Sequence, residues 1–84
     1  MLDRALLLFQ QSRYDLAAQE VRRVLGEMPN DPGAHALLGM CLVHQEKLDE
    51  AQREVEQAIA LAPAWAYTHN CRSLVLEHRN RFAA

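Results

Sequence analysis

The chain has 84 residues, of which half are hydrophobic and 24% are charged, and its formal net charge is −2. This composition is typical of one small folded domain rather than of a disordered segment. The slightly acidic balance supplies no basic field that could hold a phosphate backbone, which argues against nucleic acid as a partner.

The first residues, MLDRALLLFQ, contain an apolar run but neither a basic leader nor a small-residue cleavage site, so they do not resemble a signal peptide. No stretch reaches the roughly 20 apolar residues that span a bilayer. Cys41 and Cys71 lie thirty residues apart without CxxC spacing, which favours reduced thiols over a disulfide. We therefore expect a cytoplasmic segment that makes no contact with a membrane.

In chain order, the apolar spacing first predicts a helix that ends near Gln11. A turn over residues 12–14 follows, and then a second helix from Asp15 to about Glu27. The stretch PNDPG at residues 29–33 is a helix breaker, which separates this pair of helices from the next.

The second pair begins at Asp31 and Pro32, an N-cap residue followed by proline at the first helical position. Its first helix is expected to end near Gln45, and a turn over residues 46–48 leads to a second helix that Asp49 caps. One more helix is predicted from residue 64 to about residue 79.

These helices repeat with a period of 34 residues. RYDLAAQEV at residues 13–21 and KLDEAQREV at residues 47–55 are identical at four of nine positions, and the same offset pairs His35 with His69 and His44 with His78. A fixed period of this length predicts a helical repeat protein. The expected single domain contains one repeat at about residues 1–31, a second at about 32–65, and the first helix of a third at about 66–84.

The repeats also share small residues and prolines at three positions: Ala5, Gly39 and Ser73 at the eighth, Ala17 and Ala51 at the twentieth, and Pro29 and Pro63 at the thirty-second. In this combination the whole chain resembles the tetratricopeptide repeat (TPR) family. The resemblance implies an all-α fold of about five helices, in which helix-turn-helix repeats stack as a short right-handed superhelix. The alternative is a generic bundle of five helices without superhelical stacking.

The resemblance further implies that the first helices of successive repeats line a concave groove that binds a peptide or helix. Carried over by register, the predicted groove residues are mostly apolar: Leu2, Leu6, Phe9, Gln10, Ala36, Leu37, Met40, Val43, His44, Tyr67, Asn70, Cys71, Leu74 and His78. Further positions of the same register hold Asp3, Gly33 and Glu77. An exposed apolar surface of this kind indicates a partner that covers it, and methionine and aromatic side chains suit adaptable contacts.

Within this set the residues differ in what they indicate. Leu6, Met40 and Leu74 share the ninth repeat position and are the strongest groove candidates. Leu37 and Val43 fit the core and the groove equally well.

One function of the family is excluded by the residues present. Members that hold the carboxylate tail of heat-shock chaperones use lysine, asparagine and arginine at five positions, where this chain has Leu2, Leu6, Leu37, Tyr67 and Cys71. No chaperone-tail receptor is therefore expected. Trp65, near Tyr67, is interpreted as packing against the preceding helix, with a ligand anchor as the alternative.

The histidines raise the question of a metal site. His44 and His78 share one repeat position on neighbouring first helices, with Cys71 on about the same face. Zinc requires three or four ligands, and the chain has no compact metal motif, so solvated groove histidines are expected and no metal. His35 and His69 stand where the family usually has an aromatic residue, and they are expected to stack between repeats.

No pattern indicates catalysis. Neither cysteine has a partner at the spacing of a nucleophile and its base, and the chain has no phosphate-binding glycine loop. The acidic residues fall at predicted caps or on solvated faces, such as the row of Glu50 and Glu54. We therefore expect a protein without enzymatic activity and without a cofactor.

Two functional hypotheses follow. The leading one is a protein–protein interaction scaffold that binds a peptide or helix in its apolar groove. The alternative is a structural module that self-associates, through the groove or through its unpaired last helix, where Val75, Leu76 and Phe82 would be covered by another copy.

Overall fold

A computed structural model describes the backbone of residues 1–83 and the side chains of residues 1–81. Within these residues it contains no strand and five helices: α1 (Asp3–Gln10), α2 (Tyr14–Glu27), α3 (Pro32–His44), α4 (Leu48–Leu61) and α5 (Ala66–Ala83). The all-α fold of five helices predicted from the sequence is confirmed. The fifth helix begins two residues later and ends four residues later than predicted. No helix in the described part of the chain has the length and apolar character needed to cross a membrane.

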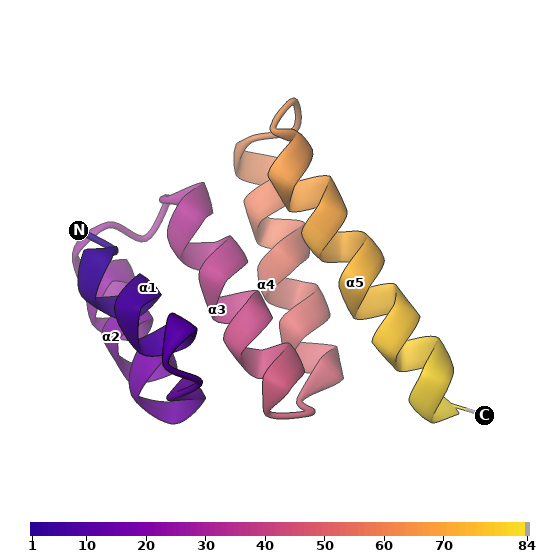
Figure 1. Ribbon diagram of the computed structural model, residues 1–84. Coiled ribbons are helices and arrows are strands. Elements are labelled where there is room, and N and C mark those ends of the chain that lie inside the picture. Colours follow the sequence, from indigo (N-terminus) through magenta and orange to yellow (C-terminus); the bar gives the residue numbers. More distant parts are fainter. Residues whose placement is uncertain (84) are drawn as a thin grey trace.

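The helices form an open stack in two layers (Figure 1). α1, α3 and α5 make one layer, and α2 and α4 make the other. Each helix packs against the next one in sequence, and α3 also packs against α5. This arrangement is that of a helical-repeat solenoid, in which each unit contacts its neighbours, and it excludes the alternative of a closed bundle.

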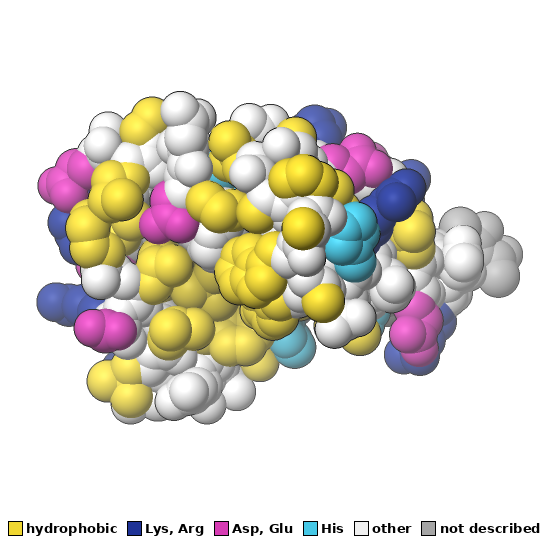
Figure 2. Space-filling view, turned by 90° about the horizontal axis from the view of Figure 1, so that it is seen from above, with side chains coloured by type: hydrophobic (Ala, Val, Ile, Leu, Met, Phe, Trp, Pro, Cys, Tyr) yellow, Lys and Arg dark blue, Asp and Glu magenta, His cyan; other side chains and the backbone are white. Residues whose placement is uncertain are grey.

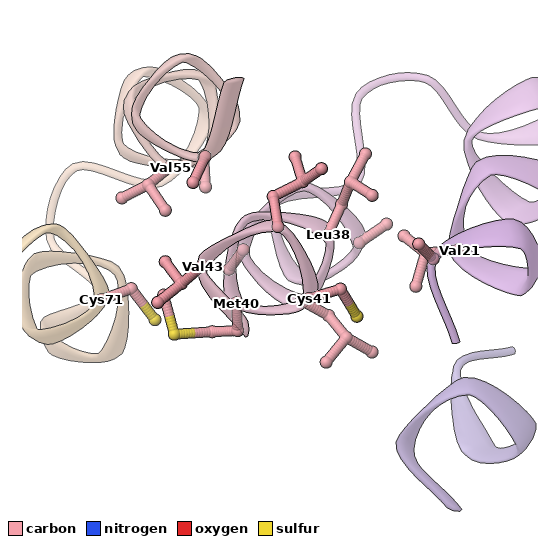
Figure 3. Close-up of a cluster of buried hydrophobic side chains, with 14 of the residues drawn as sticks. Val21, Leu38, Met40, Cys41, Val43, Val55 and Cys71 are labelled. Atoms are coloured by element: carbon pink, nitrogen blue, oxygen red, sulfur yellow. The ribbon is translucent and has the colours of Figure 1, made fainter. Parts of the chain in front are cut away.

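The core is centred on α3, where every residue from 36 to 43 is buried. A helix that is apolar on all sides has to be covered on all sides. Val21 of α2 approaches α3 from one side, while Val55 of α4 and Cys71 of α5 approach it from the other (Figure 3).

The small residue at the eighth repeat position allows α3 and α4 to approach closely. A Cβ atom placed on Gly39 would lie 2.6 Å from Val55 Cγ2 and 3.3 Å from the carbonyl oxygen of Ala51. Ala5, at the same position of the first repeat, is fully buried. The alanine and glycine of the repeat pattern are therefore requirements of helix packing.

The predicted caps were right at one helix and wrong at two. The Asp31 side chain accepts a hydrogen bond from the Gly33 amide at 3.0 Å, which confirms it as the N-cap of α3. Asp15 and Asp49 cap nothing, because α2 and α4 begin one residue earlier and each carboxylate lies in the first helical turn. There they interact favourably with the positive end of the helix dipole.

The turn inside each repeat contains a residue in the left-handed region of backbone space. The φ angle is 62° at Ser12 and 61° at Glu46, which are equivalent positions of the 34-residue period. This conformation costs a side-chain-bearing residue about 1 kcal/mol. Both turns therefore keep the shape that glycine adopts without strain, although neither contains glycine.

The histidines predicted to stack between repeats instead bind the turns that connect them. His35 Nε2 donates to the carbonyl of Pro29 at 2.7 Å, and His69 Nε2 donates to that of Pro63 at the same distance. His35 Nδ1 also lies 2.8 Å from Glu54 Oε1. Glu54 is thus half-buried at the α3–α4 contact and does not lie on a solvated face as predicted.

The close approach at Gly39 leads to a stability prediction with a matched control. Gly39→Ala is expected to destabilise the protein by about 1–2 kcal/mol, because overpacking against Val55 exceeds the helix-propensity gain of about 1 kcal/mol. Gly26 is an exposed helical site, where an added Cβ atom would meet no atom of another helix or side chain within 4 Å. Gly26→Ala is therefore expected to stabilise the protein by about 0.5–1 kcal/mol. Urea unfolding measures both changes, and a Gly39→Ala protein more stable than the wild type would contradict the packing argument.

Candidate functional site

A cavity of about 340 Å³ opens beside the N-terminal ends of α1, α3 and α5, and we call it the apolar groove. Six residues line it: Leu2, Leu6, Gly33, Leu37, Trp65 and Tyr67. Figure 2 shows hydrophobic side chains gathered around a hollow at this end of the molecule. α1 does not pack against α3 as closely as α5 does, and this leaves room for the groove.

Gly33 keeps the centre of the groove open. Asp31 and Pro32 start α3 immediately before it, so Gly33 lies in the first helical turn. A Cβ atom at Gly33 would lie 3.4 Å from Leu2 Cδ1 and 3.9 Å from Trp65 Cη2. A larger side chain at this position would occupy the space between these two groove walls.

Two aromatic residues form the wall on the α5 side. The ring centroids of Trp65 and Tyr67 are 5.2 Å apart, with planes inclined at 41°. The turn before α5 fixes Trp65, whose amide donates to the carbonyl of Ala62 at 3.1 Å and whose carbonyl accepts from the Thr68 hydroxyl at 2.7 Å. Thr68 is fully buried, so this hydrogen bond holds the turn against the core.

The exposure of the lining residues separates floor from walls. Leu37 is only 3% exposed and forms the floor, whereas Leu6, Trp65 and Tyr67 are each 41–43% exposed. Such large apolar side chains gain about 25 cal/mol for every Å² that a partner covers. The groove walls therefore favour contact with another apolar surface.

The groove carries no charge on any of its six lining residues. Desolvation by surrounding side chains, and secondarily the neighbouring Cys71 thiol, raise the pKa of Tyr67 to about 12. The tyrosine hydroxyl is therefore neutral across the physiological range. A group that enters the groove would have to be uncharged, because a buried charge without a partner is costly.

Four of the fourteen predicted groove residues meet in this cavity. Leu2 and Leu6 come from α1 and the residue that precedes it, Leu37 comes from α3, and Tyr67 comes from α5. Gly33, at a further position of the predicted register, lies between them.

Four others are core residues: Ala36, Met40, Val43 and Cys71 are at most 8% exposed. In Figure 3, Met40 and Val43 of α3 and Cys71 of α5 point toward one another. The assignment of these four residues to a ligand surface is corrected, because α5 covers the side of α3 that was expected to be open. For Val43 the alternative of a core position is the right one.

Phe9 and His44 lie apart from the apolar groove and pack with Tyr14. The His44 ring stacks on Tyr14 with centroids 4.2 Å apart, and Phe9 meets both rings edge-on at 5.4 and 5.5 Å. These three side chains join the turn of the first repeat to the end of α3.

The remaining predicted residues do not line the groove either. Gln10, Asn70 and Leu74 are exposed, and His78 is half-buried with Nδ1 2.9 Å from the carbonyl of Leu74. Among the side chains that the structure describes, no three histidine, cysteine or acidic residues are grouped so that they could hold a metal ion.

Trp65 lies outside the fourteen predicted groove residues. The preferred interpretation was packing against the preceding helix, with a ligand anchor as the alternative; Trp65 is 41% exposed and lines the cavity, which favours the alternative. The one signal in the sequence is that Trp65 and Tyr67 are two aromatic residues, two positions apart, at the start of a predicted helix; it does not by itself show which of them a ligand could reach.

Comparison with known proteins agrees with the repeat architecture. The family model described as "Tetratricopeptide repeat" matches residues 8–72. The chain belongs to the tetratricopeptide repeat family. TPR repeats generally mediate protein–protein interaction and are typically non-catalytic. Neither a search of curated proteins nor one of solved structures finds a match.

The two cysteines of this TPR chain should be chemically protected. Burial raises the pKa of Cys41 to about 11 and also raises the pKa of Cys71, which is 1% exposed. Because the thiolate is the reactive form, a disulfide reagent at about pH 8 should modify neither thiol in the folded protein and both after unfolding. Ser73→Cys, at an exposed site on α5, is the reactive control. Rapid modification of Cys71 would mean that α5 separates from α3.

Proposed function

We propose that this TPR domain is a non-catalytic scaffold whose apolar groove receives uncharged side chains of a partner peptide or helix. The observation that carries this proposal is the cavity of about 340 Å³ without a charged lining residue. This volume is at the lower end of the range for protein ligand pockets. One or two large apolar side chains of a partner would occupy it.

Contacts along α5 extend the proposed surface beyond the groove. Asn70 and Leu74 follow Tyr67 at steps of three and four residues, so the three side chains share one face of α5. All three are exposed, and Leu74 is 46% exposed. Two apolar side chains buried in the groove contribute about 3–6 kcal/mol, which offsets only part of the entropic cost of association, so these flanking contacts are needed for affinity.

Self-association through α5 is a second candidate. Leu76 is 36% exposed and Leu74 46%, so α5 presents uncovered apolar side chains. Val75, which was expected to be covered by another copy, is instead fully buried within the chain. The side chain of Phe82 lies outside the described residues.

A substitution in the groove tests the scaffold proposal. Peptides selected for binding from a random display library are expected to lose about 10- to 100-fold in affinity for Leu6→Asp, because the carboxylate replaces an apolar wall. Met28→Asp is the matched control: it changes a 42% exposed apolar residue at the end of α2 that does not line the groove. Circular dichroism verifies that both variants fold. Equal affinities for the two variants would rule out the groove as the binding surface.

The mass of the protein in solution tests the second candidate. If α5 mediates self-association, light scattering should show a mass that rises with concentration for the wild type and stays monomeric for Leu76→Asp. The aspartate would place a charge at an apolar contact. A wild-type monomer at every concentration would exclude self-association.

A further inference from the structure

The outer face of α1 lacks the cover that the equivalent face of α3 receives from α2. Leu38 and Cys41 of α3 are 4% and 0% exposed, and both point toward Val21 of α2 (Figure 3). This face of a first helix is where the second helix of the preceding repeat packs. Thirty-four residues earlier, the same face of α1 carries Arg4 and Leu7.

On α1 this face is open. Leu7 is 54% exposed, whereas its equivalent Cys41 is fully buried. α2 adds Leu16, which is 47% exposed and stands where the second repeat has the solvated residue Glu50. The two helices thus present apolar side chains, Leu7 and Leu16, at positions where packing within the chain does not require an apolar residue.

A second cavity, of about 370 Å³, lies between these helices. We call its surroundings the end face, formed by Arg4 and Leu8 of α1, Arg13 of the connecting turn, and Leu16, Gln19, Glu20 and Arg23 of α2. Leu8 and Leu16 provide apolar contact in this cavity. Leu7 follows Arg4 by three residues on α1, so the two share one face of that helix. The end face is therefore a trough between two helices, in which two leucines lie among polar and charged side chains.

Positive charge borders the trough. Arg23 Nη2 lies 2.6 Å from Glu20 Oε2, and this hydrogen bond, together with the charges of Arg23 and Arg4, holds the pKa of Glu20 below its ordinary value. The negative charge of Glu20, the only carboxylate of the end face, is therefore already balanced by Arg23. Arg4 and Arg13 form no ion pair with any side chain that the structure describes, so their charges are available to a partner.

We propose that the end face docks an amphipathic helix of a partner protein, with an apolar stripe bordered by acidic residues. A partner helix of about the length of α2 or α3, which have 14 and 13 residues, would lie over the trough between α1 and α2 at the 8–10 Å separation of packed helices. Its apolar stripe would cover Leu7 and Leu16, and its carboxylates would pair with Arg4 and Arg13.

A second copy of this chain fits the end face less well. The exposed leucines of α5, Leu74 and Leu76, are accompanied by one acidic residue, Glu77, whose Oε1 lies 3.5 Å from Arg81 Nη2. α5 therefore offers no unpaired carboxylate to Arg4 and Arg13. The acidic helix α4 buries its own apolar face in the core. The chain therefore does not present an acidic helix with an exposed apolar stripe.

The test uses two synthetic 14-residue helical peptides with the same leucine stripe, one flanked by glutamates and the other by lysines. Titration of the whole 84-residue chain, followed by amide NMR shifts, is expected to map the glutamate peptide to α1 and α2. The lysine peptide is expected to bind at least about tenfold more weakly. The double variant Arg4→Glu/Arg13→Glu should reverse that preference.

Control variants separate the end face from the groove. Arg53→Glu reverses an exposed arginine of α4 and should leave the affinity for the glutamate peptide within about twofold of wild type. Leu6→Asp, in the groove, should also leave it unchanged, whereas Leu16→Asp should weaken it about tenfold or more. A result that rejects binding at the end face therefore leaves the groove proposal intact. A result that rejects binding in the groove likewise leaves the end-face proposal intact.

Three results would overturn the inference. The first is equal affinity for the two peptides, and the second is a shift map centred on Leu37 and Tyr67 of the groove. The third is self-association of the wild type that Leu7→Asp abolishes, which would make a second copy the occupant of the end face.

Discussion

The burial of α3 is the constraint on which the rest of the structure depends. Its sequence has no polar face, and every residue from 36 to 43 has to be removed from water. α2, α4 and α5 surround it, and Gly39 lets the α4 backbone approach to a distance at which even a methyl group would collide with Val55. A helix covered in this way cannot present its middle to a ligand.

The position of the groove follows from this constraint. At the first turn of α3 the cover is incomplete, because α1 packs against α2 and leaves space beside Gly33 and Leu37. Trp65 and Tyr67 then project from the start of α5 to complete the walls. The molecule consequently has two distinct surfaces: an uncharged groove on the layer of first helices, and an end face on which arginines border apolar side chains.

Polar contacts that recur at the 34-residue offset hold the repeats in register. The Gln45 amide donates to Asp15, and one period later the Arg79 guanidinium donates to Asp49. The prolyl carbonyls accept from His35 and His69 in the same periodic way. The repeated residues were evident in the sequence but their partners were not. Aromatic stacking was predicted for the histidines, whereas in the folded chain their ring nitrogens lie beside carbonyl groups of the connecting turns.

The sequence by itself determined the features that depend on local interactions: the repeat period, the number of helices, the Asp31 cap and most helix ends to within one or two residues. The register of the repeat also placed Leu2 and Leu6 on the concave side, and both line the cavity. Only the tertiary structure decided which apolar residues of α3 are reachable and that Trp65 lines the groove. Hydrophobic periodicity predicts how a helix is oriented only where one face is apolar and the other is polar. α3 has no polar face, so the part of it that is exposed depends on how its neighbours pack.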